Sequence, residues 1–295
     1  MIDSIEKFLQ EENPALYDFK NQFQNPNEDN DNSIRKYFLY KLYSRDCDKC
    51  QLAYDIYNRL WGWPLEVNYN YRLVKLNNSK VLLGTETINS FWTTYKVVLQ
   101  TFYHDYKDEF HNQNPDKGYR AQGKVLYEWL SNKEQIKEVE KKIIDKQGEF
   151  KIYEELCKFS QLTHSIGNFT LIPVGFNAVK GTRWDVQDYF DLFLDKWKTG
   201  EWMIDQNKFK PYLKKFLLED YCPNNEIISL FKNVNRQGNQ KIDGHSEIID
   251  KTSIDEGKKI YSIKPSDNEE LYNYLYNVNH LIEERGKKIV ENLKK

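Results

Sequence analysis

Residues 163–198, THSIGNFTLIPVGFNAVKGTRWDVQDYFDLFLDKWK, combine the chain's strongest structural signals with polar residues at the joints between them. The run Phe169–Pro173 is short, apolar and favours β structure, so it predicts a strand that ends at the proline. Residues 174–181 predict a loop, because its two glycines permit positive φ and close backbone approach. An amphipathic helix with Asp185 as its N-cap follows, and Gly200 is the residue where we expect it to stop.

Outside this stretch the chain is mainly helical in pattern. Residues 71–76 alternate between apolar and polar side chains, and 81–83 form a return strand after an Asn-Asn turn, which predicts a β-hairpin. Residues 84–92 predict a loop that enters a helix. Apolar residues recur at helical spacing in several further segments; the main ones are 3–23, 52–61, 133–151, 153–162, 209–219 and 271–289.

These patterns together predict an α+β fold. We expect a mainly helical single domain over residues 1–295 with one small antiparallel sheet, because helical patterns far outnumber strand patterns. The sheet would contain the strands 71–76, 81–83 and 169–173. The polar segments 25–33 and 236–259 predict mobile loops within that domain.

Composition narrows the class of protein. The chain has 295 residues and a formal net charge of -2, so it carries no overall charge imbalance of the kind that marks many nucleic-acid or anionic-membrane binders. The N-terminus lacks the apolar core of a signal peptide, and no apolar run approaches the length of a membrane span. We therefore expect a soluble cytoplasmic protein with no membrane partner.

Cysteine usage raises the question of a metal site. The pair Cys47-x-x-Cys50 has the spacing of a zinc knuckle, but a tetrahedral site needs a second pair of ligands. The other two cysteines, Cys157 and Cys222, are isolated in the sequence. We therefore predict no structural zinc at this pair, and four cysteines are also too few for a disulfide framework.

Polar residues at the joints of the central stretch form the candidate site. Loops that flank a buried strand present polar groups from a rigid base, so we expect the turn 163–168 to meet the loop 175–181. Histidine exchanges protons near neutral pH, and side-chain amides both donate and accept hydrogen bonds. Positive charge beside a helix N-terminus favours binding of a phosphate. Alternatively, the asparagines satisfy loop backbone and the lysine is solvated. The candidate residues are His164, Asn168, Asn177, Lys180 and Arg183.

Part of this stretch resembles the ββα-metal (HNH) nucleases, in particular the HNH-like C-terminal domain of GmrSD-type restriction enzymes. The similar residues are Ile166–Ile172 and then Asn177-Ala-Val-Lys180, against a family pattern of roughly G-N-L-x-L-L, a short loop and N-x-x-K. The resemblance implies phosphodiester cleavage with a divalent metal, with His164 as general base, Asn177 orienting it, and a setting in bacterial phage defence. The family's upstream Asp/Glu-His-x-x-Pro turn has no counterpart between residues 133 and 163.

A longer and looser similarity covers roughly residues 50–235. It is to a family of uncharacterised bacterial proteins with an I-G-x4-F-P strand, an N-x-A-R-G loop and a D-R-F-D-L helix. The similar residues here are Ile166–Pro173, Asn177–Gly181 and Asp188–Leu192, with Lys in place of Arg in the loop. This resemblance implies a fold and no mechanism.

Two functions follow from these observations. The first is a divergent HNH-like nuclease or phosphodiesterase that uses a divalent metal ion. The second is a non-catalytic module that keeps the strand and loop as a scaffold and binds a nucleotide, a nucleic acid or a partner protein. The missing upstream histidine favours the second function.

Overall fold

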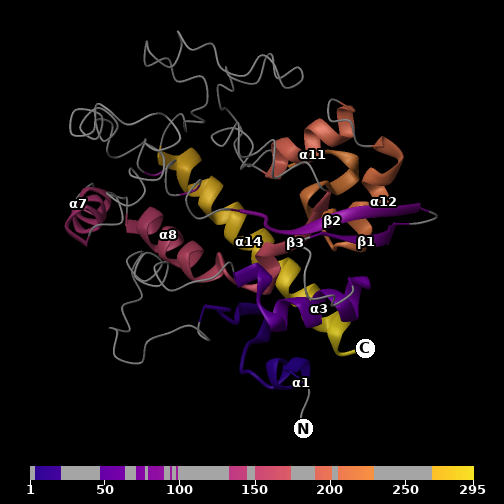
Figure 1. The fold of residues 1–295 in the computed structure, drawn as a ribbon. Helices are drawn as coiled ribbons and strands as arrows, with labels where there is room; N and C mark the ends of the chain where they lie inside the picture. The colour runs from indigo at the N-terminus through magenta and orange to yellow at the C-terminus, as the bar shows by residue number, and fades with distance from the viewer. Residues whose placement is uncertain are drawn as a thin grey trace, which may run out of the picture.

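The longest helix among the described residues, α14 (Asn268–Leu293), crosses the middle of the molecule, and several other elements pack on it (Figure 1). Its buried side chains recur every three or four residues, which is the spacing that turns one helical stripe toward a core; the apolar members are Leu271, Tyr274, Leu275, Val278, Leu281, Ile282, Ile289, Val290 and Leu293. The predicted C-terminal helix is therefore confirmed.

The computed structural model describes residues 4–20, 47–63, 71–76, 79–89, 94, 98, 133–144, 150–173, 190–200, 205–228 and 268–295. The predicted loops 25–33 and 236–259 lie outside these residues. Within them, one continuous cluster of buried side chains runs from the N-terminal helix α1 (Ser4–Leu9) to α14. The predicted α+β fold, mainly helical with a small antiparallel sheet, is confirmed.

The sheet has three antiparallel strands in the order β1-β2-β3. The strands are β1 (Tyr71–Leu76), β2 (Ser79–Thr87) and β3 (Phe169–Pro173), so the first and third match the prediction. The second is longer than predicted, because Leu83–Thr87 pair with β3 and make a strand of residues that resemble a loop when read alone. Each residue of β3 is buried, as its unbroken apolar run requires.

The N-terminal region corrects one helix prediction. The helical pattern over 3–23 predicts a break at Asn13-Pro14, but the helix is shorter than this, because α1 already ends at Leu9 and only a short 3-10 turn, η1 (Pro14–Leu16), follows. Pro14 lacks a backbone N–H and has a fixed φ, so a helix cannot continue through it. This segment instead brings Phe19 onto β3, where its ring meets that of Phe169 at 5.3 Å.

Helices cover both ends of the sheet. On one side lie α7 (Lys133–Ile144) and α8 (Phe150–Leu162), which replace the single helix predicted over 133–151 and its continuation. Toward the hairpin lie α11 (Phe190–Thr199) and α12 (Phe209–Lys215). The helix predicted over 209–219 is shorter than expected, because Leu217 has a φ of 55° that no α-helix accepts.

Aromatic side chains fill the space between these helices and the sheet. Trp197 of α11 packs on Tyr212 of α12 with ring centroids 4.6 Å apart, and Tyr212 contacts Phe216 at 5.0 Å. Phe216 in turn meets Trp61, at the end of α3 (Gln51–Trp61), at 5.1 Å. This chain of rings joins α11, α12 and α3 into one body.

Candidate functional site

The predicted turn 163–168 lies at the centre of the molecule and is held from three sides. It follows α8 and contains the 3-10 turn η4 (Ile166–Asn168), which leads directly into β3. The α14 helix packs against η4, and so does η1 from the N-terminal region. The turn is therefore part of the core scaffold.

Asn168 has a structural role in this arrangement. Its side chain is fully buried, and its amide nitrogen donates to the backbone oxygens of Asn89 and Thr163, both at 2.9 Å. Its amide oxygen accepts from the backbone N–H of Asn89 at 2.9 Å. Both ends of the amide are therefore used to join η4 to the segment after β2, and we no longer place Asn168 in the candidate phosphate site.

Gly167 explains why the turn can lie so close to α14. A Cβ at this position would lie 2.0 Å from the backbone oxygen of Ile282, and even real side chains in tight contact do not approach that closely. The Gly-Asn pair, which the sequence analysis related to a nuclease motif, is thus needed for helix packing and for bridging backbone.

Arg285 of α14 holds the central turn by hydrogen bonds to its backbone oxygens. Its Nη1 donates to the backbone oxygens of Gly167 at 2.6 Å and Phe169 at 2.7 Å, and its Nε donates to Phe216 at 3.0 Å. The side chain is 1% exposed, and its guanidinium lies over the ring of Trp61 at 5.7 Å. Burial lowers the pKa of Arg285 to about 10, so the group stays charged at neutral pH.

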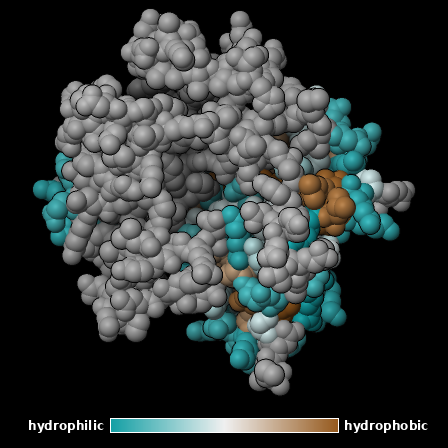
Figure 2. All heavy atoms as spheres, viewed as in Figure 1, coloured by the Kyte–Doolittle hydropathy of each residue, from teal (hydrophilic) through white to brown (hydrophobic). Residues whose placement is uncertain are grey.

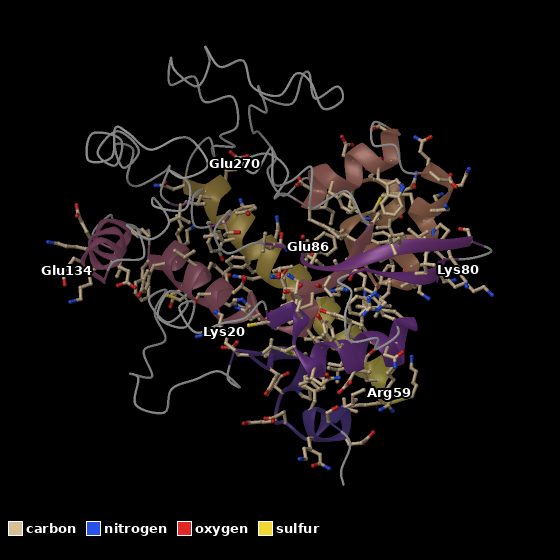
Figure 3. The ribbon with its side chains drawn as sticks, in the orientation of Figure 1. Lys20, Arg59, Lys80, Glu86, Glu134 and Glu270 are labelled. Atoms are coloured by element: carbon tan, nitrogen blue, oxygen red, sulfur yellow. The ribbon has the colours of Figure 1, made fainter. Side chains whose placement is uncertain are left out.

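His164 is half-buried at the start of the turn, beside the N-terminal segment. Its backbone oxygen accepts from the N–H of Phe19 at 3.0 Å. The pKa of His164 is well below its usual value, mainly because the imidazole is buried and secondly because the ammonium of Lys20 is near. The imidazole is therefore neutral at pH 7. Lys20 follows Phe19 in the N-terminal segment, is 2% exposed and lies near the end of α8 (Figure 3).

The remaining predicted members, Asn177, Lys180 and Arg183, lie outside the described residues. Their convergence with His164 therefore stays a prediction. Among the residues that the structure does describe, no group of three or more His, Cys, Asp or Glu side chains is placed to hold a metal ion.

The cysteine pair has a role that the spacing did not predict. Cys50 is the N-cap of α3, and its sulfur accepts from the N–H of Ala53 at 3.5 Å. Cys47 is 1% exposed, and burial raises the pKa of its thiol to about 12. Both thiols are reduced, and the one at position 47 is protonated and unreactive near neutral pH.

Two neighbouring elements at the hairpin end of the molecule contain several lysines. Lys75 and Lys80 stand directly opposite each other on β1 and β2, and both are exposed. The α12 helix packs against β1 and adds Lys210, Lys214 and Lys215. We call these five lysines the basic end. Neither the strand pairs from Val74–Val81 to Leu76–Ser79 nor α12 contains an acidic residue.

Two leucines accompany these lysines on the hairpin. Leu73 is 56% exposed and Leu82 is 42% exposed, and they are cross-strand partners two pairs away from Lys75 and Lys80, on the same face of the hairpin. The space-filling view shows a hydrophobic patch on this part of the molecule (Figure 2). Sequence reasoning missed this surface, although the alternation Leu73-x-Lys75 in β1 and Lys80-x-Leu82 in β2 was available as a signal.

Comparison with known proteins gave no match: no family model, no curated protein and no solved structure matches this chain. The two resemblances noted in the sequence therefore stay predictions. Within the described segments, each helix is too short or too polar to cross a lipid bilayer.

Proposed function

We propose that this protein binds nucleic acid through the basic end. The observation that supports the proposal is the direct opposition of Lys75 and Lys80 across the hairpin, with three further lysines on the adjoining helix α12. Like charges placed opposite each other in a sheet destabilise it. A polyanion that lies between them would convert this repulsion into attraction, and it would release condensed counterions as it binds.

The exposed leucines support a nucleic acid better than a free phosphate. Leu73 and Leu82 offer apolar surface directly beside the charges, where sugars and bases flank a phosphate backbone. A small inorganic anion would leave that surface uncovered. A purely protective role for lysines near a sheet edge is the competing explanation, because charges on edge strands prevent strand-to-strand aggregation.

Binding is favoured over cleavage by the geometry of the central turn. In the nuclease reading, the Gly-Asn pair belongs to a catalytic motif, whereas here Gly167 packs on α14 and Asn168 bridges buried backbone. The proposed base, His164, is shielded beside Lys20. The nuclease function, with His164 and Asn177 acting on a metal-bound phosphate, is therefore the alternative that the experiment below includes.

The test measures binding of labelled 20-nucleotide DNA and RNA, single-stranded and duplex, over a series of salt concentrations. In the Lys75→Gln/Lys80→Gln protein we expect weaker binding and a salt dependence of log K that is shallower by about 2, because each phosphate contact contributes about 0.9. Lys210→Gln/Lys214→Gln should behave alike. All four lysines are exposed, so neither double variant should melt at a lower temperature, and loss of the Lys75–Lys80 repulsion should raise the melting temperature slightly.

The matched control is Lys137→Gln/Lys141→Gln, which removes two exposed charges from α7, far from the hairpin (Figure 1). The control should bind like the wild type. Equal loss in control and test proteins, or no binding by the wild type, would overturn the proposal. Added Mg²⁺ or Mn²⁺ tests the alternative: cleavage that disappears in His164→Ala would restore the nuclease function.

A further inference from the structure

A ladder of stacked rings lies on the outer face of α14, toward its N-terminal end. Tyr272 and Tyr276 are one helical turn apart, with ring centroids at 6.0 Å and planes at 29°. His280 continues the ladder one turn later, 6.3 Å from Tyr276 and only 4° from parallel. We call these three residues the aromatic ladder. Residues four apart share one face of a helix, so the rings form a continuous stripe.

The ladder is on the surface, although aromatic stripes at this spacing usually face a core. Tyr276 is 48% exposed and His280 is also exposed. On the packed helix α8, Phe150 is 55% exposed and is next in sequence to Lys151, whose ammonium contacts the Tyr272 ring. An exposed cluster of large rings on two packed helices is a common feature of interaction sites.

The charge around the ladder favours a cationic partner. Over residues 268–284, α14 contains neither lysine nor arginine and four glutamates, of which Glu270 is buried and Glu283 and Glu284 already pair with Lys158 and Lys287. Glu269 is exposed and lies on the same side as Tyr272 and Tyr276, given 100° of rotation per residue. The exposed carboxylate of Glu269 would repel a nucleic-acid strand, so this face differs from the basic end.

One of these rings already contacts a cation within the protein. The ammonium of Lys151 lies 4.5 Å from the centre of the Tyr272 ring, which is the geometry of a cation–π interaction. Tyr276 and His280 have no such cation in the described part of the chain. Both side chains are exposed, so a cation from another molecule can reach them.

We propose that the aromatic ladder binds a basic segment of a partner protein. Lysine or arginine side chains of that segment lie against the rings of Tyr276 and His280 as Lys151 lies against Tyr272, and Glu269 pairs with a neighbouring cation. This inference is independent of nucleic-acid binding at the basic end, because the two surfaces lie at different ends of the molecule (Figure 1).

The test uses a fluorescein-labelled peptide of alternating arginine and glycine as the probe, measured by anisotropy at low salt. Tyr276→Ala should weaken binding about two- to fivefold, the loss expected for one exposed cation–π contact. Tyr276→Phe keeps the ring and should bind like the wild type. Glu269→Gln should also weaken binding, and more so at low salt than at high salt.

The other outcomes separate this proposal from its competitors. Equal loss in Tyr276→Phe and Tyr276→Ala, or no binding of the arginine peptide by the wild type, would overturn it. Ladder-dependent binding of an oligothymidine would assign the face to nucleic acid instead. Self-association that Tyr276→Ala abolishes would assign it to a second copy. The Lys75→Gln/Lys80→Gln protein should bind the peptide normally, whatever happens to its nucleic-acid binding.

Discussion

At the scale of single residues, the central turn shows how polar side chains serve the fold. Asn168 has no exposed surface, yet its amide makes hydrogen bonds to the backbone of residues both near and far in the chain. A buried amide that is left unbonded destabilises a protein by one to several kcal/mol, so each of these contacts is required where it lies. A Gly-Asn pair before a strand is therefore compatible with a purely structural role.

His164 gives a residue-scale prediction about pH. The folded protein holds its pKa well below the ordinary 6.5, so the unfolded chain binds more protons between the two values. The contribution of His164 to stability is therefore complete above about pH 6.5 and is lost as the pH falls toward the folded pKa, by up to about 1.4 kcal/mol per pH unit.

Urea unfolding of the wild type and of His164→Gln at several pH values between 5 and 8 measures this effect. The difference in unfolding free energy between the two proteins should shrink as the pH falls below about 6.5. A difference that stays constant over this range would show that His164 keeps an ordinary pKa when folded.

At the scale of elements, the same two hairpin lysines are expected to destabilise the fold and to bind nucleic acid. Lys75 and Lys80 are cross-strand partners, so Lys80→Glu should replace a repulsion with an attraction. We expect it to stabilise the protein by about 0.2–1 kcal/mol while it weakens nucleic-acid binding at least as much as Lys80→Gln does. Thermal unfolding and the binding assay, run on the same samples, give both quantities.

The control for this prediction is Lys141→Glu on α7, which makes the same charge change at an exposed helix position. It should leave binding unchanged. If Lys80→Glu proves neutral or destabilising while binding still falls, the two lysines do not repel each other in the free protein. The energetic argument for an anion at this site would then fail.

At the scale of the whole molecule, Arg285 joins parts of the chain that are far apart in sequence. It bonds to Gly167 and Phe169, 118 and 116 residues away, and to Phe216, 69 residues away. These bonds fasten α14, the central turn and the end of α12 to one another. The guanidinium has no carboxylate partner among the described side chains, so its charge is balanced by carbonyl oxygens and the Trp61 ring.

Arg285→Met should lower the unfolding free energy by about 3 kcal/mol or more, because it leaves several buried carbonyl oxygens without donors. Arg285→Lys should recover part of this loss, since an ammonium can reach some but not all of those oxygens. The control is Lys287→Met, an exposed position on the same helix. Urea midpoints measure the series, and an unchanged midpoint in Arg285→Met would refute the role of this residue.

Local patterns in the sequence were enough to predict the kinds of elements. The stripe of α14, the alternation of β1 and the apolar run of β3 each depend on neighbours a few residues away, and each was confirmed. The ends of an element were less predictable where contacts with another element decide them. Residues 84–87 become a strand only because β3 lies beside them.

The site depended on tertiary structure. Sequence order placed the candidate residues around His164, but the fold uses Gly167 and Asn168 to pack α14 and to bridge backbone 79 residues away. The basic end combines lysines from a hairpin and from α12, more than 100 residues later, and only the packing of α12 on β1 brings these two segments together. Such contacts depend on long-range packing, which local periodicity does not encode.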